Sequence, residues 1–185
     1  MPLLIKAKRV NLRTLRHSDA ESLCRYIRDP ENGRWLLIPW PYQLSDAHVF
    51  IKNSRKWAHQ KSPTNIGCGI VLKETGEVIG GIGMHKIDRR MKNAEIGCWI
   101  GKPYRGTGLM VEAMKAMLKY AFDELKLKRV YAHIFVENVA SRKMVEKCGF
   151  VREGRLRASH LHHRHWRDSY LYSILKEDFR IRRSE

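Results

Sequence analysis

The feature that most constrains the fold is a change of hydrophobic period near residue 101. Before it, short apolar segments are separated by polar turns, which is the pattern of an antiparallel meander of strands. After it, apolar residues recur at the spacing of an amphipathic helix. The expected strands are 65–73, 78–86 and 94–100, and the helical stripe from Met110 consists of Ala113, Met114, Met117, Leu118, Ala121, Phe122 and Leu125.

The C-terminal part continues to alternate between the two periods. We expect a strand at 129–136 and a helix at 139–148 that Gly149 ends. Two antiparallel strands are expected at 150–159 and 166–175. A meander followed by helix, strand, helix and hairpin predicts a mixed α/β sheet with helices on its faces.

The N-terminal third is expected to hold one strand and two helices. Residues 9–16 alternate as a strand does, and a helix at 17–29 follows with Ser18 as its cap. A second helix is expected to begin at Ser45. The proline-broken segment 30–43 is rich in large apolar groups, so it either packs on the core as an irregular loop or lines a binding pocket.

Length and composition limit the class of protein. A chain of 185 residues with 43% hydrophobic content can build one sizeable core, so we expect a single domain over residues 1–185. No apolar run approaches the roughly 20 residues that span a bilayer, and the N-terminus lacks the pattern of a signal peptide. A cytoplasmic protein with no membrane partner is expected. The scattered cysteines, read as free thiols in a reducing compartment, are Cys24, Cys68, Cys98 and Cys148.

The net charge is high and positive. The chain has 36 Lys and Arg against 19 Asp and Glu, which leaves +17 at pH 7. Basic residues are spread along the chain, so no single tail accounts for the excess. Such a field attracts polyanions and repels small cations. Two interpretations stay open, a solvated basic surface without a specific partner and association with an RNA-rich assembly such as the ribosome.

The sequence R-G-T-G at 105–108 stands between a predicted strand and the long helix. Backbone N–H groups at a helix start lack intrahelical acceptors and lie at the positive end of the helix dipole, so phosphate is the natural ligand. A P-loop would need Gly-Lys-Ser/Thr where Leu109 and Met110 follow, and a dinucleotide fingerprint would need Gly or Ala at Val111. The pyrophosphate of coenzyme A is the remaining candidate.

Two linked motifs carry a resemblance to a known family. The runs AEIGCWIGKPYRGTGLMVEAMKAML (94–118) and VENVASRKMVEKCGFVREGRLR (136–157) resemble the GCN5-related N-acetyltransferase (GNAT) superfamily, in particular its ribosomal-protein N-terminal acetyltransferases. The resemblance covers most of the chain, from about Arg9 to Leu175. It implies an α/β fold with a mixed, mostly antiparallel sheet of about seven strands flanked by helices, and acetyl-CoA as the acetyl donor.

The resemblance also implies the residues that bind the cofactor. The pantetheine arm would pair along the strand through Cys98, Trp99 and Ile100. Asn138 and Ser141 match the family's Asn-x-x-Ser pattern and would face the thioester. Pro103 departs from the family, so any side-chain contact to phosphate falls on Arg105 or Lys102. Backbone amides would hold the pyrophosphate at Arg105, Gly106, Thr107, Gly108, Leu109 and Met110.

The chemistry of acetyl transfer requires a base, an oxyanion donor and an acid. Glu95 is our candidate base, acting through water, and its alternative role is an outward-facing salt bridge. The backbone N–H of Cys98 could serve the oxyanion. Ser141 is our candidate proton donor to the sulfur, beside Asn138, and its alternative role is a helix cap that touches the cofactor.

Other polar residues are interpreted structurally. The histidines in HLHHRHW (160–166) are expected at a polar hairpin tip without a metal. His85 and His133 are expected to be half-buried strand residues, and Tyr131 a core aromatic. Cys98 is expected to pack rather than react, since direct acyl transfer needs no cysteine nucleophile.

The sequence therefore predicts an acetyl-CoA-dependent N-acetyltransferase that uses direct attack in a ternary complex. The expected acceptor is a protein N-terminal α-amine of the ribosomal type, on a monomer or homodimer. Two alternatives stay open. One is acetylation of a small amine such as an aminoglycoside, amino acid or polyamine, and the other is a non-catalytic RNA- or ribosome-binding module.

Overall fold

The structure, a computed structural model, describes residues 2–179. In this part of the chain eight strands form a single sheet in the order β1-β2-β3-β4-β5-β6-β8-β7. All neighbouring strands are antiparallel except β5 and β6, which are parallel. The strands are β1 (Leu4–Lys6), β2 (Val10–Arg13), β3 (Ile66–Leu72), β4 (Val78–Asp88), β5 (Asn93–Ile100), β6 (Arg129–Phe135), β7 (Val151–His162) and β8 (His165–Leu175).

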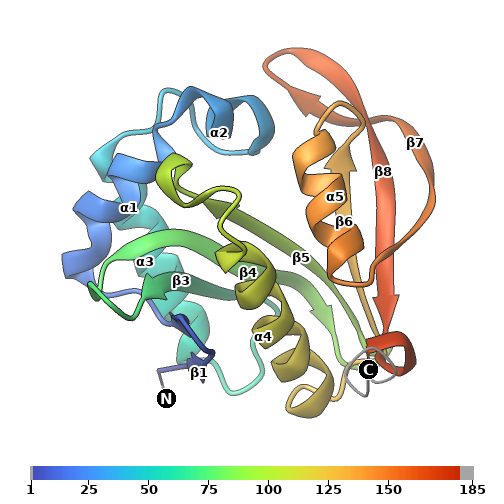
Figure 1. Cartoon of the computed structure of the whole chain (residues 1–185), viewed down its shortest axis with the longest axis horizontal. Coiled ribbons are helices and arrows are strands. Elements are labelled where there is room, and N and C mark those ends of the chain that lie inside the picture. Colours follow the sequence, from blue (N-terminus) through green and yellow to red (C-terminus); the bar gives the residue numbers. More distant parts are fainter. Residues whose placement is uncertain (1, 180–185) are drawn as a thin grey trace.

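Helices cover both faces of this sheet (Figure 1). One face packs under α4 through a large apolar core that includes Met114 and Phe122. The other face packs under α1 and α3 through a smaller core that includes Leu23 and Ile51. The helices are α1 (Ala20–Ile27), α2 (Pro30–Trp35), α3 (Leu44–Ala58), α4 (Leu109–Asp123) and α5 (Val139–Lys147), with short 3-10 turns η1 (His17–Asp19) and η2 (Lys102–Tyr104).

The predicted fold class is confirmed, with one strand more than the expected seven. The addition is β1, a three-residue strand that pairs with β2. Three residues are too few for an alternating pattern to be recognised. The meander, the long helix and the C-terminal hairpin lie where the sequence predicts them. Gly149 ends α5 with φ of +97°, and its N–H donates to the carbonyl oxygen of Glu146 at 3.0 Å.

The predicted starts of the first two long helices are corrected. Ser18 is not the cap of the first helix, because Asp19 accepts the N–H of Arg16 at 2.6 Å and also pairs with Arg13 at 2.7 Å. This carboxylate closes a 3-10 turn before α1 begins. The next helix starts at Leu44 instead of Ser45, since the Gln43 N–H is bonded to the carboxylate of Asp46.

Segment 30–43 is not wholly irregular. It begins with α2, which has Pro30 in its first turn and is capped by the Asp29 side chain, an acceptor for the Glu31 N–H at 3.1 Å. Further along, Tyr42 is buried against α1 and α3. No helix in residues 2–179 is long and apolar enough to cross a bilayer.

Candidate active site

The site begins where two parallel strands separate. β5 and β6 pair only over Asn93–Glu95 and Arg129–Tyr131. Past Glu95, the edge of β5 that faces β6 has no paired strand within the described residues. A cleft of about 780 Å³ opens there, and its lining includes side chains from both faces of the sheet. The cleft therefore passes through the sheet.

Alternation along the strands assigns the cleft residues to two faces. Ala94 and Ile96 of β5 belong to the core beneath α4, so Glu95 points to the opposite face. We call these sides the α4 face and the Glu95 face. The same parity places His85 of β4 and Tyr131, His133 and Phe135 of β6 on the Glu95 face, and of these His85, His133 and Phe135 line the cleft.

On the α4 face, the loop before α4 presents main-chain amides to the cleft. Gly106 and Gly108 line the cleft and have φ of +76° and +81°, a conformation that favours glycine. Within residues 2–179, none of the N–H groups of 106–111 donates a hydrogen bond to a backbone acceptor. A Cβ added at Gly106 would meet nothing within 4 Å. The open space, the unpaired amides and the start of α4 fit a phosphate group.

A second helix start lies across the cleft. Asn138 is the N-cap of α5, and its side-chain oxygen accepts the Ser141 N–H at 3.1 Å. Both residues line the cleft. The cap of α5 is therefore Asn138 and not Ser141, whose hydroxyl has no hydrogen-bond partner in the described part of the chain. This hydroxyl is available to a ligand.

On the Glu95 face, one carboxylate lies among basic groups. The Glu95 oxygen is 2.9 Å from Lys86 Nζ, and its side chain is 19% exposed. Burial lowers the pKa of His85 and of His133, while the charge of Glu95 acts in the opposite direction on both. His133 Nδ1 is buried without a hydrogen-bond partner among residues 2–179. Glu95 thus lines the cleft and forms a salt bridge, so the two roles considered for it coexist geometrically.

Two segments far apart in sequence meet over the Glu95 face (Figure 1). At the tip of the β7–β8 hairpin, His162 Nε2 is 3.2 Å from the Leu36 carbonyl oxygen, and His163 Nε2 is 3.1 Å from that of Gly33. The Arg167 guanidinium lies over the ring of Trp35 at 5.7 Å. Segment 30–43 therefore both packs on the core and lines the cleft. The residues that line the cleft are Glu31, Asn32, Trp35, Leu36 and Leu37.

Arg105 lines the cleft and makes its polar contacts within the protein. Its guanidinium is 2.9 Å from the Asp29 carboxylate and 2.9 Å from the Asn32 amide oxygen. Its N–H donates to the Lys102 carbonyl oxygen at 3.2 Å. Because both groups are engaged within the protein, Arg105 ties the loop to α2, and the unpaired amides begin at Gly106.

The remaining predicted residues lie at or beside the cleft. Burial raises the pKa of the Cys98 thiol to about 12, which agrees with a packing role for this side chain. The histidines of 160–166 lie at a hairpin tip whose turn is formed by His163 and Arg164. No group of His, Cys, Asp or Glu that could hold a metal exists in the described residues. His160, whose ring contacts that of His133 at 5.4 Å, lines the cleft, and no local pattern marks it.

Comparisons with known proteins agree with this geometry. Residues 9–151 match the family model described as the acetyltransferase (GNAT) domain. Bacillus subtilis YdaF, provisionally named a ribosomal N-acetyltransferase, is 32% identical over 92% of this chain and 93% of its own length. A Vibrio cholerae spermidine N(1)-acetyltransferase is 28% identical over 80% of this chain and 82% of its own. A crystal structure of a GNAT-family acetyltransferase from Bacillus anthracis has a TM-score of 0.80 and 29% identity, covering 95% of this chain and 99% of that one.

The family model covers more than half of the chain, and the relatives align along most of it. The chain belongs to the GNAT acetyltransferase family and is an acetyl-CoA-dependent N-acetyltransferase.

Proposed function

We propose that the acceptor is the α-amine of a polypeptide N-terminus, with ribosomal proteins as the acceptor class. The observation that carries this proposal is the scarcity of free carboxylates around the cleft. Within the described residues its acidic lining consists of Glu31 and Glu95. Glu31 accepts the indole N–H of Trp35 at 2.8 Å, and Glu95 is paired with Lys86.

A polyamine or aminoglycoside carries several positive charges, and each loses hydration on entering the cleft. That cost is offset only where a carboxylate pairs with each charge. An N-terminal α-amine brings a single charge, so it loses less hydration than a polycation and needs fewer carboxylates to offset that loss. The net charge of +17 favours the same choice, because it repels polycations at long range.

The names of the relatives point to both acceptor classes. YdaF is provisionally named for a ribosomal substrate, and the Vibrio relative is named for spermidine. YdaF shares more identity with this chain over a greater part of its length. This supports the polypeptide acceptor, as does the lack of spare carboxylates.

The cleft residues have complementary roles in this proposal. An alkylammonium must lose a proton before it attacks, and Glu95 accepts that proton through a water. The Cys98 N–H stabilises the oxyanion, and the Ser141 hydroxyl protonates the departing sulfur. Ser141 then regains a proton from water as Glu95 releases the one that it accepted. Acetyl-CoA supplies the activated acetyl group. Asn138 holds the start of α5, so that the Ser141 hydroxyl stays at the cleft.

The cofactor contacts follow from the α4 face. The free amides from Gly106 through Met110, with Thr107, Gly108 and Leu109 between them, bind the pyrophosphate. The unpaired edge of β5 at Cys98, Trp99 and Ile100 receives the pantetheine arm as an added strand would be received.

The test is a transfer assay with labelled acetyl-CoA and a panel of amines. We expect label on peptides with a free N-terminus and little on spermidine or an aminoglycoside. The control is the same peptide with a blocked N-terminus and an internal lysine, which separates α-amines from side-chain amines. Efficient labelling of spermidine with none of the peptides labelled would exclude the proposed acceptor.

The ribosome is the partner that we propose for the basic surface, in the cytoplasm. Binding dominated by phosphate contacts weakens steeply with salt. Cosedimentation with ribosomes that is lost between low and moderate salt would support this partner. Absence of cosedimentation even at low salt would exclude it.

A further inference from the structure

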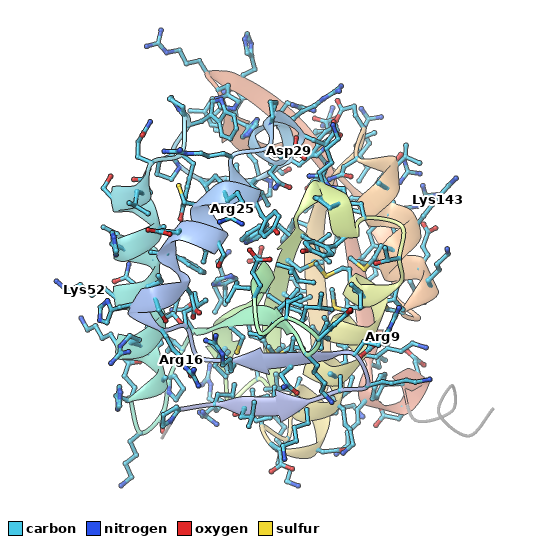
Figure 2. All side chains as sticks on the ribbon, turned by 60° about the vertical axis from the view of Figure 1, so that its left-hand side comes forward. Arg9, Arg16, Arg25, Asp29, Lys52 and Lys143 are labelled. Carbon is cyan, nitrogen blue, oxygen red and sulfur yellow. The ribbon has the colours of Figure 1, made fainter. Side chains whose placement is uncertain are left out.

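We propose that Arg9 is a positioning residue that holds the phosphate-binding loop in its open conformation. The inference rests on the proposed use of the amides of 106–110 for pyrophosphate. Arg9 stands just before β2, at the end of the N-terminal strands and beside α4 (Figure 2). Its Nη1 donates to the Thr107 carbonyl oxygen at 3.1 Å, a contact across 98 positions of sequence.

The contact fixes the orientation of one peptide group. In a trans peptide the carbonyl and the following N–H point in opposite directions. A guanidinium that holds the Thr107 carbonyl therefore turns the Gly108 N–H away from itself. Gly106 and Gly108 line the cleft, whereas Arg9 and Thr107 do not, so that direction is toward the cleft.

Glu112 sets the position of the guanidinium. Its carboxylate accepts from Arg9 Nε at 2.9 Å and from the Val10 N–H at 3.2 Å. The Glu112 side chain is only 17% exposed and lies in the first turn of α4. Burial alone would raise the pKa of Glu112, but the hydrogen bonds from Arg9 and Val10 hold this pKa below its ordinary value. The guanidinium is thus fixed at two points, one on the helix and one on the loop.

The left-handed turn needs such an external anchor. Gly106 and Gly108 can adopt many backbone conformations, and a free loop would populate several of them. A second anchor is Thr107 Oγ1, which donates to the Tyr104 carbonyl oxygen at 2.7 Å. A Cβ at Gly108 would lie 3.4 Å from Arg9 Nη2, so the guanidinium packs directly on the loop backbone.

Three variants distinguish a positioning role of Arg9 from an effect of its positive charge alone. Arg9→Ala removes both, Arg9→Lys keeps the charge without the planar fork, and Lys8→Ala removes a neighbouring exposed charge. Calorimetry with coenzyme A measures the dissociation constant. We expect Arg9→Ala and Arg9→Lys each to raise it about tenfold, the size of effect expected for a hydrogen bond to a charged group. Lys8→Ala should leave it nearly unchanged.

Steady-state kinetics supply the second measurement. Both Arg9 variants should raise KM for acetyl-CoA while kcat and the KM for the acceptor stay near wild type. If Arg9→Lys binds coenzyme A as tightly as wild type does, charge alone matters. Equal losses of coenzyme A affinity in Arg9→Ala and Lys8→Ala would lead to the same conclusion. Either result would overturn the proposal. Coenzyme A binding needs no acceptor, so a wrong acceptor assignment leaves this test intact.

Discussion

The two faces of the cleft are built from different groups. The α4 face offers main-chain N–H groups from one continuous stretch, 106–111, at the start of one helix. The Glu95 face offers side chains from several elements, including His85 of β4, Glu95 of β5, His133 of β6 and His160 of β7. One face is contiguous in sequence, and the other is assembled by the tertiary fold.

This difference means that diphosphate binding and acceptor recognition place different demands on the sequence. A diphosphate can be bound by amides whatever the side chains are, provided that the glycines permit the turn. Acceptor recognition depends on side chains, which can change without altering the sheet. Two relatives of this chain are accordingly named for different acceptors.

The largest expected effect is on the Glu95 face. Glu95→Gln should lower kcat by about 10²-fold, since general base catalysis contributes 10² to 10⁴. The dissociation constant of coenzyme A should stay unchanged, because the residue lies on the other face. Steady-state kinetics and calorimetry measure the two quantities.

Lys86→Gln is the matched control, because it removes the ion pair and leaves the carboxylate in place. If it costs as much activity as Glu95→Gln, the ion pair matters more than the base. A large change in coenzyme A affinity in either variant would show that the Glu95 face also contributes to cofactor binding.

The opposite pattern is expected on the α4 face. Gly106→Ala places a methyl group in the open space before α4 and strains a φ of +76°. We expect the dissociation constant of coenzyme A to rise at least tenfold, and the strain to cost about 1 kcal/mol of stability. Calorimetry and thermal unfolding report the two effects.

Gly76→Ala separates these effects. Gly76 has φ of +73°, and a Cβ added there would also meet nothing within 4 Å, but this glycine lies in the turn between β3 and β4. The variant should lose similar stability and keep full affinity for coenzyme A. Similar affinities for the two variants would remove Gly106 from the phosphate site.

The α4 face could be predicted from sequence because its parts are local. A strand that ends at Ile100, the glycines at 106 and 108 and an apolar stripe specify the turn and the helix within one residue of its observed start at Leu109. The same reasoning does not reveal the ion pair of Arg105, since its partner Asp29, the N-cap of α2, is distant in sequence.

The Glu95 face could not be predicted in this way. His162 meets Leu36 across 126 positions, and His160 meets His133 through the pairing of β7, β8 and β6. No period or spacing in the sequence encodes such contacts. Of the side chains on this face, the sequence predicts a catalytic role only for Glu95, because it is a carboxylate in an otherwise apolar strand.

A smaller effect is expected where α5 begins. Asn138→Ala removes an N-cap, which costs about 1 kcal/mol, and a domain of this size should lose about 2–4 °C in Tm. Asn138→Asp keeps a capping oxygen and should retain the Tm. If the cap also positions Ser141, the alanine variant will lose kcat and the aspartate variant will keep most of it. Equal kcat in both would limit Asn138 to a structural role.

The smallest effect concerns the contact that covers the Glu95 face. Burial, followed by the charge of His163, lowers the pKa of His162, while hydrogen bonding to the Leu36 carbonyl opposes the shift. The fold thus favours the neutral ring. The stability that His162 contributes is present above its unfolded pKa of about 6.5 and is lost as pH falls through the lower folded value.

His162→Gln keeps a side-chain N–H near the Leu36 carbonyl but cannot titrate. Between pH 7.5 and 5, wild type should therefore lose more Tm than the variant, by a few degrees at most. Comparing the two proteins cancels the titration of His85 and His133, whose pKa values are also lowered. Acceptor KM should rise in acid for wild type more than for the variant, with coenzyme A affinity equal in both. A parallel change in coenzyme A affinity would mean that the hairpin contact acts on both faces and that the division between them fails at this point.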